Sequence, residues 1–194
     1  MPVGTGVRYL YAAEYTANGT TISYGEPFNV ARLVSASPEI ETGDDVTYYA
    51  DDTQAESAGG IFTGGKLKLT VDGIADDIRV KITGAKATTV NGVTATVNTA
   101  YDEMPYLGIG YVERFMHHGK TTFVPVFFPK AQFSPEVREA KTQEDSIEFQ
   151  SIDIEAVLMR DDTEDANWRY IGAGKTTAAE ALKDLKALMG SEAA

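Results

Sequence analysis

The glycine-rich run at residues 171–176 is the stretch that most invites a chemical interpretation, because it ends in Gly174-Lys175-Thr176. A loop that cradles phosphates has its first glycine five residues before the glycine of this triplet. Arg169 occupies that position here. We therefore interpret the run as a flexible hinge ahead of the last helix, and not as a nucleotide site.

His117 and His118 are the two histidines of the chain. Neighbouring side chains on a strand or tight turn point in different directions, so the pair indicates a hairpin tip and not a metal site. The acidic cluster at 161–165 lacks the central glycine of a calcium loop, and we interpret it as a solvated linker. The acid pairs Asp44-Asp45 and Asp51-Asp52 have no accompanying nucleophile or metal set. The sequence thus predicts no catalytic residue, cofactor or metal, and a protein that is not an enzyme.

The charge balance limits the classes of molecule that the protein can bind. The 194 residues include 17 basic and 29 acidic side chains, which gives a net charge of −12. Phosphates and anionic lipid repel such a protein, so we expect neither tight nucleic acid binding nor membrane contact. The lack of cysteine excludes disulfides, thiolate zinc sites and cysteine nucleophiles. No secretory signal or stretch of about 18 apolar residues is expected either.

Alternation of apolar and polar residues predicts that most of the chain forms β-sheet. Residues 66–71 alternate cleanly, which gives one apolar face and one wet face. The Asn91-Gly92 pair fits a type I′ hairpin turn, because both residues of that turn take positive φ. Residues 106–128 have the pattern of a longer hairpin. Along 146–159 the apolar positions change parity, so we expect a bend near Gln150-Ser151.

Two segments have helical patterns. The first covers about residues 73–84, with Asp72 as its N-cap and isoleucines at spacing four on one face. The second covers about residues 178–189 and opens with a capping box formed by Thr177 and Glu180.

The segment between Leu33 and Gly65 contains no lysine or arginine and seven acids, namely Glu39, Glu41, Asp44, Asp45, Asp51, Asp52 and Glu56. Its pattern is weak, so we expect a long acidic loop at about 38–64. Aromatic residues Tyr48-Tyr49 inside an acidic loop favour a surface that becomes ordered against a partner.

Together these elements predict a mainly β (α+β) fold, a β-sandwich or barrel with one packed helix, the acidic loop and a C-terminal helix. Residues 1–160 are expected to form the β-sandwich domain. Residues 161–194 are expected to be a linker and helix appended to it.

Several segments in a fixed order carry a family resemblance. They are YADD at 49–52, GGKLKLTVDGI at 64–74, GIGYV at 108–112, FFPKAQF at 127–133 and TQEDSIEFQ at 142–150. In this order they resemble the major tail proteins, or tail tube proteins, of long-tailed bacteriophages with non-contractile tails. The resemblance covers roughly residues 1–160.

The resemblance implies a β-sandwich flanked by a helix, and hexameric rings that stack into a tube lined by extended hairpins. It implies several partners: further copies of the chain, a tape-measure protein in the lumen, and tail terminator and distal tail proteins at the tube ends. DNA would pass through the tube without tight binding. The implied location is the virion, after assembly in the cytoplasm of the bacterial host.

On this basis we expect the acidic segment to form the subunit or ring interface, and acids of a later strand to face the lumen. The interface candidates are Asp44, Asp45, Tyr48, Tyr49, Asp51 and Asp52. The lumen candidates are Glu144, Asp145, Glu148 and Asp153. Carboxylates on the wall would repel phosphates and let a duplex slide.

Other functions stay open at this level. The inner tube of a contractile tail or tail-like injection particle is one, because the sheath is a separate chain. A monomeric β-sandwich that binds carbohydrate is another, with Tyr48-Tyr49, Tyr101 and Tyr106 as the aromatic platform. A hydrolase would need a carboxyl pair in a cleft, with one pKa raised. Size in solution separates a monomeric module from a protein that polymerises.

Overall fold

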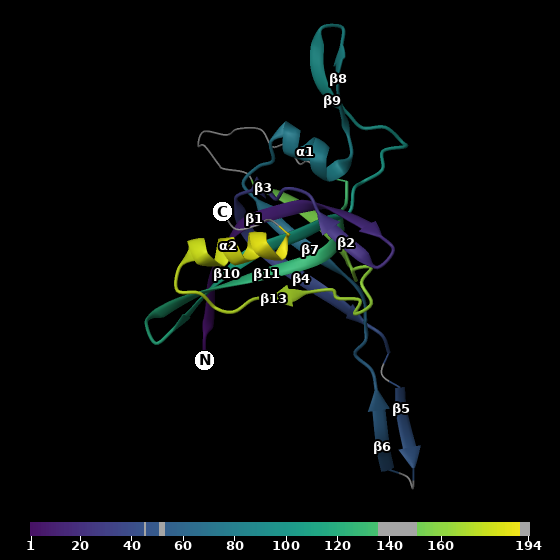
Figure 1. Cartoon of the computed structure of the whole chain (residues 1–194), viewed down its shortest axis with the longest axis vertical. Helices are drawn as coiled ribbons and strands as arrows, with labels where there is room; N and C mark the ends of the chain where they lie inside the picture. The colour runs from purple at the N-terminus through teal and green to yellow at the C-terminus, as the bar shows by residue number, and fades with distance from the viewer. Residues whose placement is uncertain (45, 51–52, 136–150, 191–194) are drawn as a thin grey trace, which may run out of the picture.

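The computed structural model describes residues 1–44, 46–50, 53–135 and 151–190. Within them the fold is mainly β with two helices, as the sequence predicts. Nine strands form one antiparallel sheet in the order β2-β1-β10-β11-β12-β7-β4, with β3 paired to β1 and β13 paired to β11 (Figure 1). These strands are β1 (Val3–Asn18), β2 (Thr21–Tyr24), β3 (Phe28–Ala31), β4 (Leu33–Thr42), β7 (Phe62–Val71), β10 (Leu107–His117), β11 (Lys120–Phe133), β12 (Ile152–Met159) and β13 (Tyr170–Ile171).

The sheet curls around one main hydrophobic core. Side chains from β1, β7, β10, β11 and β12 meet there, including the fully buried Leu10, Leu67 and Phe128. The predicted alternation at 66–71 is confirmed, because Leu67, Leu69 and Val71 are buried while Lys66 and Lys68 face solvent. Burial on one side and charge on the other fix the register of β7 between β12 and β4.

A bulge lets β1 serve two layers. Tyr9 has φ 62°, and the pairing with β10 shifts between Arg8 and Tyr11. Leu10 then enters the main core, whereas Tyr9 and Tyr11 pack in a second cluster on the other face of the sheet. An extra residue in one strand reverses the side-chain parity beyond it, and accordingly Val7 before the shift and Leu10 after it both pack in the main core.

Helix α1 (Asp76–Thr83) is shorter than predicted and is capped differently. Its N-cap is Ala75, which has no capping side chain, so the prediction of Asp72 as the cap is wrong. Asp72 instead accepts a hydrogen bond from the backbone N–H of Arg32 and pairs with its guanidinium. The helix ends where predicted, at Gly84 with φ 71°. There a Cβ would lie 2.2 Å from a backbone oxygen.

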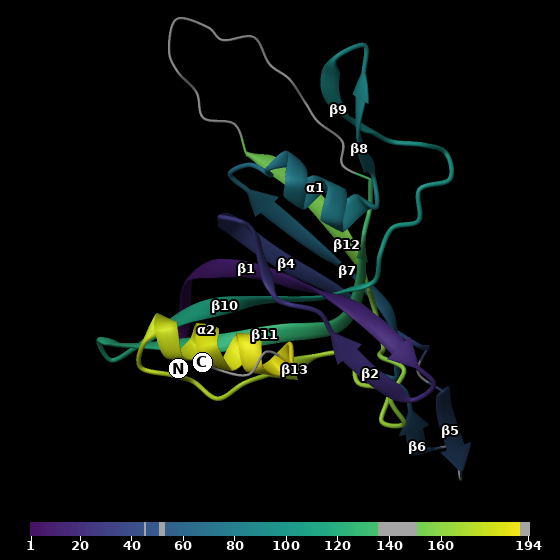
Figure 2. The same cartoon turned by 45° about the horizontal axis from the view of Figure 1, so that its top comes forward.

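Helix α2 (Ala178–Leu188) lies across the outer face of β10 and β11 (Figures 1 and 2). The predicted capping box is confirmed, since the Thr177 hydroxyl accepts from the Glu180 backbone and the Glu180 carboxylate accepts from the Thr177 backbone. Leu185 and Met189 are fully buried against the sheet. Gly110 makes this close approach possible, because a Cβ there would lie 2.4 Å from Leu185.

Two predicted hairpins form as expected. In the β10–β11 hairpin His118 and Gly119 take φ of 47° and 74°. The second joins β8 (Lys86–Val90) to β9 (Val93–Val97) through Asn91 and Gly92, with φ of 52° and 81°. Both are two-residue turns with positive φ at each central residue, which matches the right-handed twist of the flanking strands.

Three sequence-based interpretations need correction. The predicted acidic loop at 38–64 is largely strand: β4, then β5 (Val46–Ala50), β6 (Thr53–Ala58) and the start of β7. The run at 171–176 is not a hinge, since Gly172 and Lys175 donate backbone hydrogen bonds to β11. The cluster at 161–165 is solvated only in part, because Asp161 is buried whereas Asp162, Glu164 and Asp165 are exposed. Most of the predicted bend near Gln150-Ser151 lies outside the described residues, and β12 begins at Ile152.

Candidate assembly surfaces

The β5–β6 ribbon carries two of the six predicted interface residues, Tyr48 and Tyr49. It continues β4 and β7 away from the body, at the lower end in Figure 1. In its backbone register Tyr48 pairs with Glu56 and Tyr49 with Gln54, with a register shift between the two tyrosines. Asp44 is exposed at the root. The other predicted members lie outside the described residues: Asp45, Asp51 and Asp52.

The root of this ribbon is held by an aromatic stack. The rings of Phe62 and Trp168 lie 4.6 Å apart at an interplanar angle of 3°. The Gly43 N–H donates to the Ile61 carbonyl at 2.9 Å, while the Ile61 side chain is 78% exposed. The stack ties the start of β7 to the segment before β13, so the ribbon leaves a fixed base. Trp168 is also the single tryptophan of the chain and therefore a fluorescent reporter of this base.

The lumen candidates are only partly placed. Glu144, Asp145 and Glu148 lie outside the described residues. Asp153 is exposed on β12 and accepts a 2.7 Å hydrogen bond from the Thr70 hydroxyl. Asp153 belongs to the outward face of β4, β7 and β12.

That outward face is a mixed ladder of charges. Lys68 pairs with Glu39 at 2.7 Å, and Lys66 pairs with Glu155 at 3.1 Å. The Glu39 contact raises the pKa of Lys68, mainly through its hydrogen bond. The face is therefore not a uniform wall of carboxylates, and its two lysines both have acidic partners.

The β8–β9 ribbon is a surface that sequence reasoning did not single out. It stands free of the main sheet beyond α1, at the upper end in Figures 1 and 2. Val90 and Val93 flank its turn and are 52% and 66% exposed. The sequence signal was the Asn91-Gly92 turn, which predicts a hairpin but not that the hairpin leaves the body.

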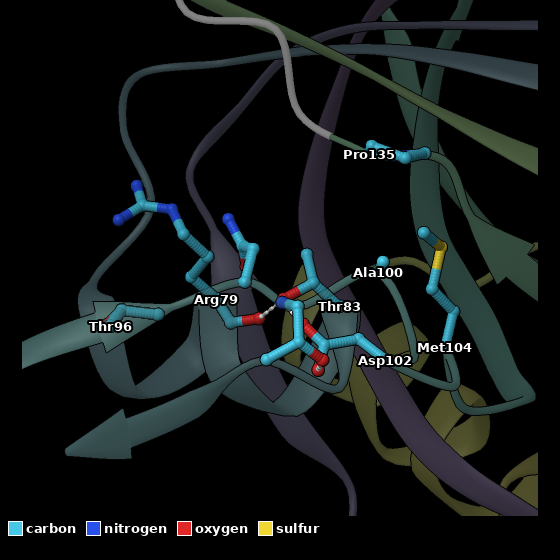
Figure 3. Close-up of a pocket in the computed structure, with 9 residues that line it drawn as sticks. Arg79, Thr83, Thr96, Ala100, Asp102, Met104 and Pro135 are labelled. Atoms are coloured by element: carbon cyan, nitrogen blue, oxygen red, sulfur yellow. Dashed lines mark hydrogen bonds between the residues drawn. The ribbon is translucent and has the colours of Figure 1, made fainter.

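A pocket of about 560 Å³ lies between α1, the segment after β9 and the end of β11 (Figure 3). Its polar groups are engaged locally. Arg79 pairs with Asp76 and donates to the Ile74 carbonyl, and Asp102 accepts from the Thr99 amide at 2.7 Å and hydroxyl at 2.6 Å. In Figure 3 the Arg79 guanidinium points away from Met104. The hydrogen bonds from Thr99 lower the pKa of the Asp102 carboxyl.

A shallower groove of about 330 Å³ lies where the start of β1, the start of β4 and the end of β10 meet. Small residues line much of it, including Gly4, Gly6 and Ala36. Val34 on its wall is 60% exposed. Burial raises the pKa of Glu113, which also lines the groove. Glu113 and Arg114 are the two charged residues among the nine that line the groove.

Asp161 organises the segment after β12, and Asp162 fastens that segment to the sheet. The Asp161 carboxylate accepts from the Thr163 amide and hydroxyl and from the Asn167 amide. Asp162 accepts from the Tyr15 hydroxyl and the Lys130 ammonium, both at 2.7 Å. Both contacts lower the pKa of Asp162, and the hydrogen bond from Lys130 has the larger effect. Burial, with help from Asp162, raises the pKa of Tyr15 to about 12.

The tyrosines proposed as a carbohydrate platform differ in their surroundings. Lys130 covers one face of the Tyr106 ring, with its ammonium 4.8 Å from the ring centre. Tyr101 is 93% exposed beside the pocket of Figure 3. For Tyr48 and Tyr49 only the place on β5 is established.

Neither a metal site, a membrane-spanning helix nor a known relative identifies the function of the described part of the chain. Within the described residues no group of three acidic or histidine side chains could hold a metal ion. None of the helices there has the length and apolar character needed to cross a bilayer. The sequence matches no protein-family model, and no curated protein matches it. The phage tail resemblance therefore has no support from a matched family or relative.

Proposed function

We propose that this chain is a structural virion protein whose copies form hexameric rings that stack into a phage tail tube. The tube would surround a tape-measure protein and conduct the genome. The observation that carries the proposal is the pair of ribbons that leave the curled sheet in different directions, each outside the main sheet (Figure 1). A two-stranded ribbon alone is marginally stable in water, so ribbons of this kind gain stability when they pack against another surface.

The edges of the sheet support the same proposal. In the described residues β4 pairs with β7 on one side, and its other side beyond Leu33 has no partner strand. Glu39 and Pro38 stand on this strand, and such residues at an edge prevent indiscriminate pairing. A specific neighbour that covers this edge would prevent the exposed backbone groups of β4 from pairing with unrelated chains. The net charge of −12 fits a conduit that does not retain DNA.

The test is the size and shape of the purified protein across a concentration series. Sedimentation velocity should show discrete ring-sized species or polymers, and negative-stain electron microscopy should show hollow rings or tubes with six-fold symmetry. A chain that stays monomeric up to about 1 mM, which corresponds to an association free energy weaker than about −4 kcal/mol, would overturn the proposal. Binding of oligosaccharides by that monomer would favour the carbohydrate-binding module.

The contractile alternative shares the ring and tube. It predicts the same assembly by this chain, with a second protein around the outside. Imaging of intact particles that contain the chain would decide between the two, since a sheath adds an outer layer that shortens.

A further inference from the structure

The β8–β9 ribbon has two chemically different faces. Residues directly opposite in its register share a face, because side chains alternate along each strand. One face carries the pairs Val90–Val93, Thr88–Ala95 and Lys86–Val97, and the other carries Thr89–Thr94 and Ala87–Thr96. The first face is therefore mostly apolar towards its tip, and the second is rich in hydroxyl groups.

The apolar face of the ribbon is not covered by the described part of the chain. Val90 and Val93 lie side by side at the tip and are more than half exposed. The Asn91-Gly92 turn between them has the positive φ values of a type I′ turn. A projecting ribbon with an exposed apolar pair at its end has the properties of a docking element.

Charge indicates that the partner is another copy of this chain. Two copies with a net charge of −12 repel each other over most of their surfaces. The twelve residues from Lys86 to Val97 hold one charged side chain, that of Lys86. A strongly charged partner would be matched by charges on the ribbon, whereas an acidic copy is met most easily by an uncharged tip.

The groove between β1, β4 and β10 is the complementary surface. Its lining of Gly4, Gly6 and Ala36 leaves room, and a Cβ added to Gly6 would meet nothing within 4 Å. Val34 supplies an exposed apolar wall. Arg114 also lines the groove, and its buried Nε has no acceptor in the described residues.

We propose that the tip of the β8–β9 ribbon of one copy docks into the groove of a second copy, with Val90 and Val93 against Val34. This inference rests on the proposed self-assembly and names the surfaces that perform it. The ribbon and the groove are different surfaces of one molecule, so the contact is heterologous and repeats from copy to copy. It closes a ring or extends a filament according to the angle between successive copies.

Disulfide trapping tests the contact directly, because the chain has no cysteine to compete. A V34C/V93C variant should form a ladder of disulfide-linked oligomers under mild oxidation. V34C/T94C is the matched control, since Thr94 lies one residue further on, on the opposite face of the ribbon. We expect cross-linking at least about tenfold faster for Val93 than for Thr94, because a disulfide needs Cβ atoms about 4 Å apart. Equal rates for the two pairs would overturn the inference.

Charge substitution separates failure of this inference from failure of the proposed function. V90D/V93D should weaken assembly at least about 100-fold, because carboxylates would be buried in an apolar contact. T89D/T94D adds the same charge to the other face and should assemble like the parent. Far-UV circular dichroism and Trp168 fluorescence verify that each variant folds. If the parent assembles and V90D/V93D assembles equally well, the docking inference is wrong and the tube proposal stands. If the parent stays monomeric, both fall.

Discussion

Replacing Gly110 with alanine tests whether the tight contact between α2 and the sheet stabilises the protein. The added Cβ would lie 2.4 Å from Leu185 Cδ1 and 2.8 Å from the Val126 carbonyl oxygen. Carbon atoms in contact normally lie about 3.5–4.0 Å apart, so the methyl group overlaps Leu185 by roughly 1 Å. Leu185 is fully buried and Val126 belongs to β11. Relief therefore requires that the helix moves, the strand moves, or both.

The expected cost follows from that geometry. Overpacking a well-packed interior costs about 1–3 kcal/mol, and a backbone atom among the clashing groups favours the upper half of that range. For a chain of this size each kcal/mol lowers the melting temperature by about 2–4 °C. We therefore expect Gly110→Ala to melt about 4–12 °C below the parent.

Urea unfolding followed by circular dichroism measures this cost, with Gly4→Ala as the matched strand glycine. A Cβ at Gly4 would meet only Phe115 Cε1, at an ordinary 3.9 Å, so that variant should stay within about 0.5 kcal/mol of the parent. Adding Leu185→Ala to both backgrounds isolates the clash, and we expect a coupling free energy of at least about 1 kcal/mol. Equal midpoints for Gly110→Ala and Gly4→Ala would refute the reasoning.

Three further outcomes are expected. Burial raises the pKa of Glu113, so its ionised form destabilises the fold. Glu113→Gln should therefore gain a few tenths of a kcal/mol in unfolding free energy at pH 7, a gain that disappears as the parent carboxyl is protonated at low pH. Tyr15 has a folded pKa of about 12 against an ordinary 10.0, so its contribution is complete below pH 10 and declines as pH rises. Tyr15→Phe should then lose less stability than the parent between pH 10 and 12 in alkaline unfolding. Combined Glu39→Gln and Glu155→Gln frees two lysines, and assembled tubes of this variant should retain duplex DNA in a salt-sensitive manner at about 0.1 M salt, unlike the parent or Asp153→Asn.

Local chemistry made the turns and helix ends predictable. Positive φ occurs at Asn91, Gly92 and Gly84 because of the residue types alone. Glycine lacks a Cβ, and asparagine tolerates the left-handed region. The capping box at Thr177 and Glu180 closes over three residues. Where the deciding contacts are only a few positions apart, the sequence contains all the information that the prediction needs.

The acidic segment shows why strands in a ribbon escape prediction from pattern. Alternation of apolar and polar residues arises when one face of a strand is buried and the other is wet. The strands β5 and β6 pair with each other outside the main sheet, whose core imposes that alternation on its own strands. The β-branched and aromatic residues at 46–49 were the remaining strand signal, and the high density of acids obscured it.

The glycines at 172 and 174 were misinterpreted for a different reason. A Cβ at Gly172 would lie 2.6 Å from Pro125 Cγ, and one at Gly174 would lie 2.5 Å from Thr122 Cγ2. Glycine serves either conformational freedom or close approach of the backbone to a neighbour. The neighbour here is β11, far away along the chain, so only the folded structure separates the two uses.

Charge pairing on the outward face of β4, β7 and β12 bears on the physical requirement for a conduit. This face interleaves Lys66 and Lys68 with Glu155 and Glu39. A duplex that passes such a face is retained by lysines that are free to release its counterions, and not by the net charge as such. Each lysine here already contacts a carboxylate at 2.7–3.1 Å, so binding a phosphate would first require that this contact be broken. If this face lines the bore, DNA slides because the two lysines of the face are already neutralised by neighbouring carboxylates. The surplus of acids elsewhere on the protein serves solubility before assembly.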